Sequence, residues 1–166
     1  MALTDEEAIE RAKTAIMNLA IGNMRKSAAG GANLGAFILG SCIIDYLSCL
    51  YAGKDVGGDG YREFVSRFFE DKRYDPRDLW TSIRCGLVHK FAVEDGRFAY
   101  THNEPHLHFK TDKSGRTYLN LEQFMDDIEA AARRFFEAVD ADPEIRAHVV
   151  KRVTKVGIMR VFDPEF

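Results

Sequence analysis

The pattern of apolar positions along the chain predicts a mainly helical protein. Apolar residues at helical spacing follow the capping-box pair Thr4 and Glu7 and indicate a first helix over about residues 5–26. A second helix, apolar on nearly all sides, ends near Gly53 and is typical of the centre of a core. Small residues recur every four positions along it up to Gly40, so we expect another helix to approach it closely there.

Further helices are expected towards the C-terminus. Asp75–Pro76 is a start signal, because an N-cap acid precedes a proline at the first helical position. Asn120 with Gln123 is a capping pattern for the helix that follows, which has the clearest amphipathic face in the chain. Together the patterns predict four more helices, over about residues 61–70, 121–139 and 143–155 and from residue 76 to an end at about 89–91.

In one region apolar and polar residues alternate with the period of a β-strand. A short strand is expected over 97–101, and apolar and polar residues alternate over 106–110. Residues 112–115 have the composition of a turn into a second strand. The sequence therefore predicts a small β-hairpin insert around residues 97–119.

Composition and charge narrow the class of protein. A chain of 166 residues is long enough to bury a substantial core, and we expect one helical domain over residues 1–166. Met1 leads into acidic residues without a basic and apolar signal segment, and the apolar run over 34–44 is far short of the ~20 residues of a membrane span. Three cysteines without a Cys-x-x-Cys pair are typical of reduced thiols, so a cytoplasmic location without membrane attachment is expected. The net charge of −3 gives no overall attraction to nucleic acid, so any site for a polyanion must be local.

Arg84 and His89 form the pair that most clearly indicates chemistry. They offer a permanent cation and a group that titrates near neutral pH, near the end of a predicted helix. Five residues along an α-helix correspond to a rotation of about 500°, so the two side chains should point about 140° apart. One helix alone is therefore not expected to bring both onto one small ligand. Either His89 lies where the helix frays, or two copies of the helix meet at a two-fold axis, and the geometry favours the dimer.

The sequence around this pair resembles a known family. Arg84-x4-His89 at a helix C-terminus, inside a helical domain of this size, is similar to the motif of the HEPN superfamily (higher eukaryotes and prokaryotes nucleotide-binding). The sequence from Phe64 to His89, with the β insert and the long amphipathic helix that follow it, resembles that of a bacterial HEPN-like subgroup. The resemblance spans roughly residues 4–140. It implies an up-and-down bundle of five to six helices that forms a homodimer through the helix carrying the motif.

The resemblance also implies a function. Many HEPN proteins are metal-independent endoribonucleases in which the ribose 2′-hydroxyl attacks the adjacent phosphate. Carried over, Arg84 would neutralise the phosphate and His89 would act as general base or acid, without a cofactor. The implied partners are RNA or a nucleotide and, for a toxin or defence protein, an antitoxin. Active relatives usually carry Asn, Asp or His after the arginine, whereas this chain has Cys85, so a non-catalytic HEPN-like interaction module is the alternative.

Two further positions are candidates for substrate binding or for orienting the pair, in addition to Cys85. Asp45 interrupts the apolar second helix, and a carboxylate there needs a partner. Arg84 is one such partner, and another base or partial exposure of Asp45 is the alternative. His102 is a candidate to line a substrate groove beside His89.

A group of histidines in the insert leaves two interpretations open. His106 and His108 should share one face of a strand, with His102 nearby. Three imidazoles can bind zinc, which makes His106 and His108 candidate metal ligands. Only Glu104 adds another ligand type at close spacing, so we favour a solvated strand face and expect no metal.

Overall fold

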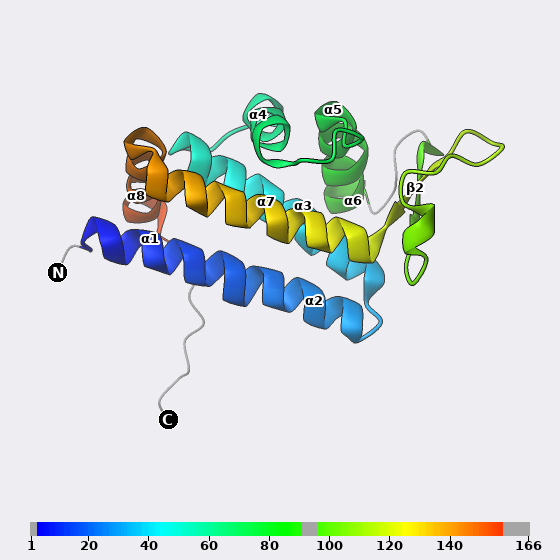
Figure 1. Cartoon of the computed structure of the whole chain (residues 1–166), viewed down its shortest axis with the longest axis horizontal. Coiled ribbons are helices and arrows are strands. Elements are labelled where there is room, and N and C mark those ends of the chain that lie inside the picture. Colours follow the sequence, from blue (N-terminus) through cyan, green and yellow to red (C-terminus); the bar gives the residue numbers. More distant parts are fainter. Residues whose placement is uncertain (1–2, 91–95, 158–166) are drawn as a thin grey trace.

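The structure, a computed structural model, describes residues 3–90 and 96–157 and is mainly helical (Figure 1). The first predicted helix is confirmed as a continuous run of α1 (Asp5–Thr14), the π-helical segment η1 (Ala15–Ala20) and α2 (Ile21–Ala29). Its capping box is present, since the Thr4 hydroxyl accepts the backbone N–H of Glu7 and the Glu7 carboxylate accepts that of Thr4. The widened π-helical segment was not indicated by the apolar pattern.

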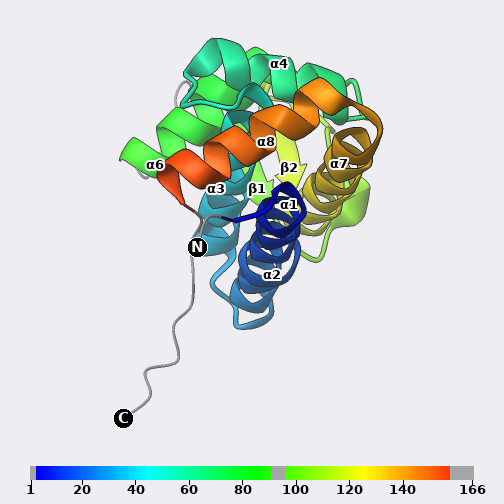
Figure 2. The same cartoon turned by 90° about the vertical axis from the view of Figure 1, so that its left-hand side faces the viewer.

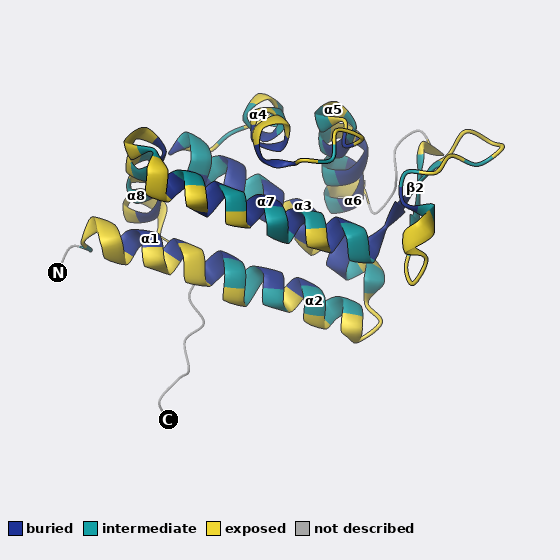
Figure 3. Ribbon diagram, viewed as in Figure 1, coloured by how far each residue is buried: buried dark blue, intermediate teal, exposed yellow. Residues whose placement is uncertain are grey.

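The second predicted helix is confirmed as α3 (Asn33–Ala52), which ends at Gly53 in the left-handed region. α3 packs beside α7 (Leu121–Ala141), and buried positions are concentrated on these two helices (Figure 3). At Gly40, a Cβ atom would lie 2.8 Å from Cδ1 of Ile128 and 3.0 Å from the ring of Phe124 on α7. The close approach expected at Gly40 is therefore observed.

This close contact gives a test of the packing between α3 and α7. Gly40→Ala is expected to lower the free energy of unfolding by about 1–2 kcal/mol, because overpacking outweighs the better helix propensity of alanine. Gly22→Ala is the matched control, since nothing lies within 4 Å of the Cβ position there. The control should raise the free energy of unfolding by up to about 1 kcal/mol. Urea unfolding of both variants measures the difference, and a stabilised Gly40→Ala protein would contradict the packing.

The shorter helices cross the long ones. α4 (Gly58–Phe68) begins and ends earlier than its pattern predicted, and α8 (Pro143–Val156) lies across the ends of the long helices (Figure 2). The helix predicted from Asp75–Pro76 consists of three consecutive segments, with the Asp75 carboxylate accepting the backbone N–H groups of Arg77 and Asp78. These are α5 (Pro76–Asp78), the π-helical segment η2 (Leu79–Cys85) and α6 (Gly86–Lys90). The helix was predicted to end at about residues 89–91; α6 includes residues 89 and 90, and residue 91 lies outside the described residues.

The β insert differs from its prediction. Its strands, β1 (Phe98–Thr101) and β2 (Thr117–Asn120), form a parallel pair and not a hairpin. The strand expected over 106–110 is wrong, because Pro105–Leu107 forms the 3₁₀ turn η4 and Phe109 has a φ of +60°. The predicted turn at 112–115 is present, and an isolated antiparallel bridge joins Thr111 to Thr117 beside it. The alternating pattern therefore reflects local turns that the chain makes between two parallel strands.

α3 is also long and apolar enough to span a membrane by length and composition, and half of its apolar window is buried inside the protein. The core helix of a globular protein has the same pattern. Most buried hydrophobic residues of the described chain form one cluster, to which α3 contributes from Ala36 to Leu50.

Candidate functional site

The guanidinium of Arg84, at the end of η2, is anchored by a carboxylate on α3. Nη2 of Arg84 lies 2.7 Å from Oδ2 of Asp45, and Nε lies 3.2 Å from the same oxygen. The guanidinium carbon also lies 5.0 Å from the ring centre of Trp80, one helical turn earlier, in a cation–π contact. The structure thus pairs Asp45 with Arg84, one of the two interpretations that the sequence left open.

Arg84 also contacts His89 within a single chain. Its Nη1 lies 2.6 Å from Nε2 of His89. The expectation that one helix cannot bring the two side chains together is therefore wrong. That expectation used a regular α-helix, whereas Arg84 lies in a widened π-helical turn and its long side chain reaches along the helix towards the exposed His89.

The direction of this hydrogen bond fixes the state of the imidazole. Arginine has only donors, so Nε2 of His89 must accept the hydrogen bond through its lone pair. In this arrangement the ring proton is on Nδ1. The side chain of His89 thus presents a basic nitrogen directly to the cation of Arg84.

The electrostatics keep the arginine charged. Desolvation lowers the pKa of Arg84, but the hydrogen bond and the charge of Asp45 outweigh it, and the pKa is raised overall. The side chains of Arg84 and Asp45 are only 20% and 22% exposed, so their attraction is little screened. The hydroxyl of Tyr61 is buried nearby without a hydrogen-bond partner among the described residues, and burial, followed by the charge of Asp45, raises its pKa.

Comparison of the chain with models of known protein families, with curated proteins and with solved structures gives no match.

Besides Asp45, the predicted position Cys85 lies beside the pair, directly after the arginine. His102 is exposed and contacts the side chain of Asn103, and within residues 3–90 and 96–157 no contact joins it to Arg84 or His89. His106 is exposed, and its Nδ1 lies 3.3 Å from Oε2 of Glu104. The interpretation of His106 and His108 as neighbours on one strand face is wrong, because the 3₁₀ turn leaves His106 in solvent and buries His108.

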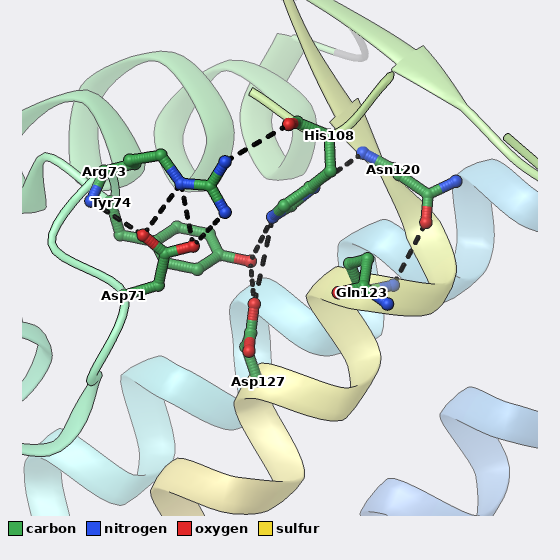
Figure 4. A network of polar contacts seen from close by, with 7 residues as sticks. All are labelled: Asp71, Arg73, Tyr74, His108, Asn120, Gln123 and Asp127. Carbon is green, nitrogen blue, oxygen red and sulfur yellow. Dashed lines mark hydrogen bonds and ion pairs between the residues drawn. The ribbon is translucent and has the colours of Figure 1, made fainter. Parts of the chain in front are cut away.

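His108 belongs instead to a buried network that also includes Tyr74 and Asp127 (Figure 4). Its Nδ1 accepts the backbone N–H of Asn120 at 3.1 Å, so the proton of the neutral ring is on Nε2. Nε2 lies 3.3 Å from the hydroxyl of Tyr74, which in turn donates to Oδ2 of Asp127 at 2.8 Å. Burial lowers the pKa of His108 to about 4 and raises that of Asp127.

The same region contains the one group of potential metal ligands in the described chain, formed by Asp71, His108 and Asp127. The hydrogen bonds do not fit a metal. A metal on Nε2 of His108 would require the proton to move to Nδ1, where the N–H of Asn120 already points. Both carboxylate oxygens of Asp71 accept hydrogen bonds from Arg73, Oδ1 from Nε and Oδ2 from Nη2. The network therefore orders the insert against α7, and neither His106 nor His108 is arranged as a metal ligand here.

No sequence pattern indicated the partners of His108. Tyr74, Asn120 and Asp127 all lie at least 12 residues from His108 in the chain, and each lies in an ordinary helix-start or amphipathic pattern. The contact between Trp80 and Arg84 was likewise missed, although their spacing of four residues is a helical neighbour spacing.

Proposed function

We propose that this protein binds the phosphate of RNA or of a nucleotide at Arg84 and His89. The observation that carries the proposal is the contact between Nη1 of Arg84 and Nε2 of His89, with the guanidinium fixed from behind by Asp45. A structural ion pair would need only Arg84 and Asp45. The additional exposed histidine, held at the free edge of the guanidinium, is suited to an anionic ligand that carries protons.

The geometry supports a metal-independent endoribonuclease of the HEPN type. A phosphate bound by Nη1 of Arg84 would release Nε2 of His89 as a free base. The imidazole would take the proton of the ribose 2′-hydroxyl while its oxygen bonds to phosphorus. The bond from phosphorus to the 5′-oxygen would break, and the imidazole would return the proton to that leaving oxygen. Arg84 would stabilise the charge that develops on the phosphate.

A HEPN-like bundle and a cytoplasmic toxin or defence role, with an antitoxin as partner, follow only from the sequence resemblance. Cys85 favours a second candidate, a non-catalytic HEPN-like interaction module, because a thiol is a poor replacement for the polar residue of active relatives. Binding without cleavage distinguishes this candidate from the nuclease.

A homodimer through α6 is part of the proposal. Contact between Arg84 and His89 within one chain removes the geometric need for a dimer, so its support is now the resemblance and the exposure of His89 at the end of the helix. Light scattering coupled to size-exclusion chromatography should give twice the mass of the chain. His89→Glu, which adds a carboxylate at the proposed two-fold contact, should give more monomer. A monomer at all concentrations would contradict the dimer.

Phosphate binding is tested by removing the cation. Arg84→Ala should weaken the binding of a single-stranded RNA oligonucleotide at least tenfold, because one charge-assisted hydrogen bond is worth about 1.5–3 kcal/mol. It should also reduce the salt dependence of binding by about one counterion. Arg133→Ala removes an equal charge from α7, where Arg133 pairs with Glu129, and should leave binding unchanged.

A double variant controls for the carboxylate that Arg84→Ala leaves unpaired. Arg84→Ala with Asp45→Asn removes the repulsion of the phosphate by Asp45, so any weakening that remains belongs to the arginine. Equal RNA affinity in the wild type, the Arg84 variant and the double variant would refute the proposed site.

A further inference from the structure

An apolar cavity of about 310 Å³ lies between the π-helical segment η1 and α3. This volume is at the lower end of the range for small-molecule sites. Its wall is formed mainly by apolar side chains from both elements, Ala15, Ile16, Ala20, Leu39 and Ile43. π-Helical segments often occur at functional sites, and the chain places one at this cavity and the other under Arg84.

Three further lining residues add an aromatic ring, a side-chain amide and a thiol to the apolar wall of the cavity. Tyr46 is half-buried and adds an aromatic wall, and Asn23 is exposed and adds a side-chain amide. Cys42, in an apolar helical segment, is nevertheless exposed and lies at the cavity. Nucleobases stack on aromatic side chains, and an asparagine amide matches the donor and acceptor on one edge of adenine.

The cavity adjoins the phosphate site. Cys42 and Asp45 lie three residues apart on α3, so they are neighbours on one helix face, and Asp45 holds Arg84 at 2.7 Å. Partial burial raises the pKa of the Cys42 thiol, and the charges of Arg84 and Asp45 both act on it, in opposite directions. The cavity at Cys42 therefore lies about one helical turn from Asp45, the residue that holds Arg84. A ligand whose phosphate binds Arg84 can reach the cavity with another of its groups.

We infer that this cavity is a base-binding subsite, which takes the nucleobase, an adenine in particular, of the ligand whose phosphate binds Arg84. The inference rests on the proposed function, because it places the base relative to the phosphate. It narrows the ligand of the proposed function to a nucleotide or to RNA with an unpaired base, since a paired base cannot enter a cavity.

The test compares two probes that differ only in the base. Adenosine 5′-monophosphate should bind the wild type about tenfold more tightly than ribose 5-phosphate, because stacking of one base contributes about 1–3 kcal/mol. Ala20→Phe fills the cavity and should abolish that difference while leaving the affinity for ribose 5-phosphate unchanged. Ala29→Phe makes the same substitution at an exposed position of α2 outside the cavity and should keep the difference. If Ala20→Phe does not fold, Cys42→Phe fills the cavity from an exposed position.

The rate at which N-ethylmaleimide alkylates Cys42, read by peptide mass spectrometry, reports occupancy directly. Adenosine 5′-monophosphate should slow it at any protein concentration, and ribose 5-phosphate should not. Slower alkylation on raising the protein concentration alone would show that a second copy covers the cavity, and protection by octanoate in place of the nucleotide would assign it to an acyl chain. Either result overturns the subsite.

The probes separate failure of the subsite from failure of the proposed function. Equal affinity for the two phosphates, both lost in Arg84→Ala, would overturn the base subsite and leave the phosphate site standing. Failure of both probes and of RNA to bind would refute the phosphate site and the subsite together.

Discussion

His89→Ala is expected to slow RNA cleavage by two to four orders of magnitude, the usual contribution of a general acid or base. Nε2 of His89 accepts a hydrogen bond from Arg84, so its lone pair is already aimed at the position where a phosphate would bind. Cleavage should persist in excess EDTA, because the proposed proton transfers use only side chains. The rate is measured with a fluorescently labelled single-stranded RNA under single-turnover conditions.

The control for this variant is His106→Ala, which removes an exposed histidine that pairs with Glu104 on the insert. It should cleave at the wild-type rate, and RNA binding by His89→Ala should change much less than its cleavage rate. Cleavage that survives His89→Ala, or that stops on addition of EDTA, would contradict the mechanism. An RNA complex that forms without cleavage in the wild type would instead assign the protein to the non-catalytic alternative.

Acid is expected to destabilise the fold through His108 by about 3 kcal/mol. In the folded protein burial lowers the pKa of His108 to about 4, against 6.5 when the chain is unfolded. Between about pH 6.5 and pH 4, His108 therefore binds a proton in the unfolded state but not in the folded state. The free energy of unfolding falls as the pH is lowered through this range. A difference of about 2.5 pH units corresponds to about 3 kcal/mol. Above pH 6.5 this stabilisation is fully present.

Urea unfolding at pH 7 and at pH 4.5 measures this loss. His108→Gln should be less stable than the wild type at pH 7, because it loses the contacts with Asn120 and Tyr74, and it should lose much less stability on acidification. The raised pKa of Asp127 acts in the opposite direction at the acidic end, so the difference between the two proteins isolates the histidine. His106→Gln should show the wild-type pH dependence, and an equally flat profile for His106→Gln would disprove the assignment.

The features that the sequence predicted well are local. The caps at Thr4, Asp75 and Asn120 and the left-handed glycine at 53 are read from a few neighbouring residues, and each occurs where its pattern indicates. The pairing of Asp45 with Arg84 was one of two interpretations, because an acid in an apolar helix requires a partner but does not specify which one.

The features that the sequence did not predict depend on contacts between distant residues or on small changes of helical pitch. The two π-helical segments keep the amphipathic pattern of an α-helix. The residue types therefore did not indicate the wider turn that contains Arg84. The alternation at 106–110 had the period of a strand, but Pro105 and the packing of Phe109 against Arg73 and Tyr74 hold it as a turn. The role of His108 followed from Tyr74 and Asp127, which no local pattern connects to it.

Asn120 has a consequence for how the insert and the core unfold. It is the last residue of β2, its side chain caps α7 by accepting the N–H of Gln123, and its own N–H binds His108. Residues that share one set of contacts open together, and regions that open together form one cooperative unit. The insert is therefore not an independent appendage: it can detach only by releasing the first turn of α7, so its amides should exchange with solvent on the timescale of that helix.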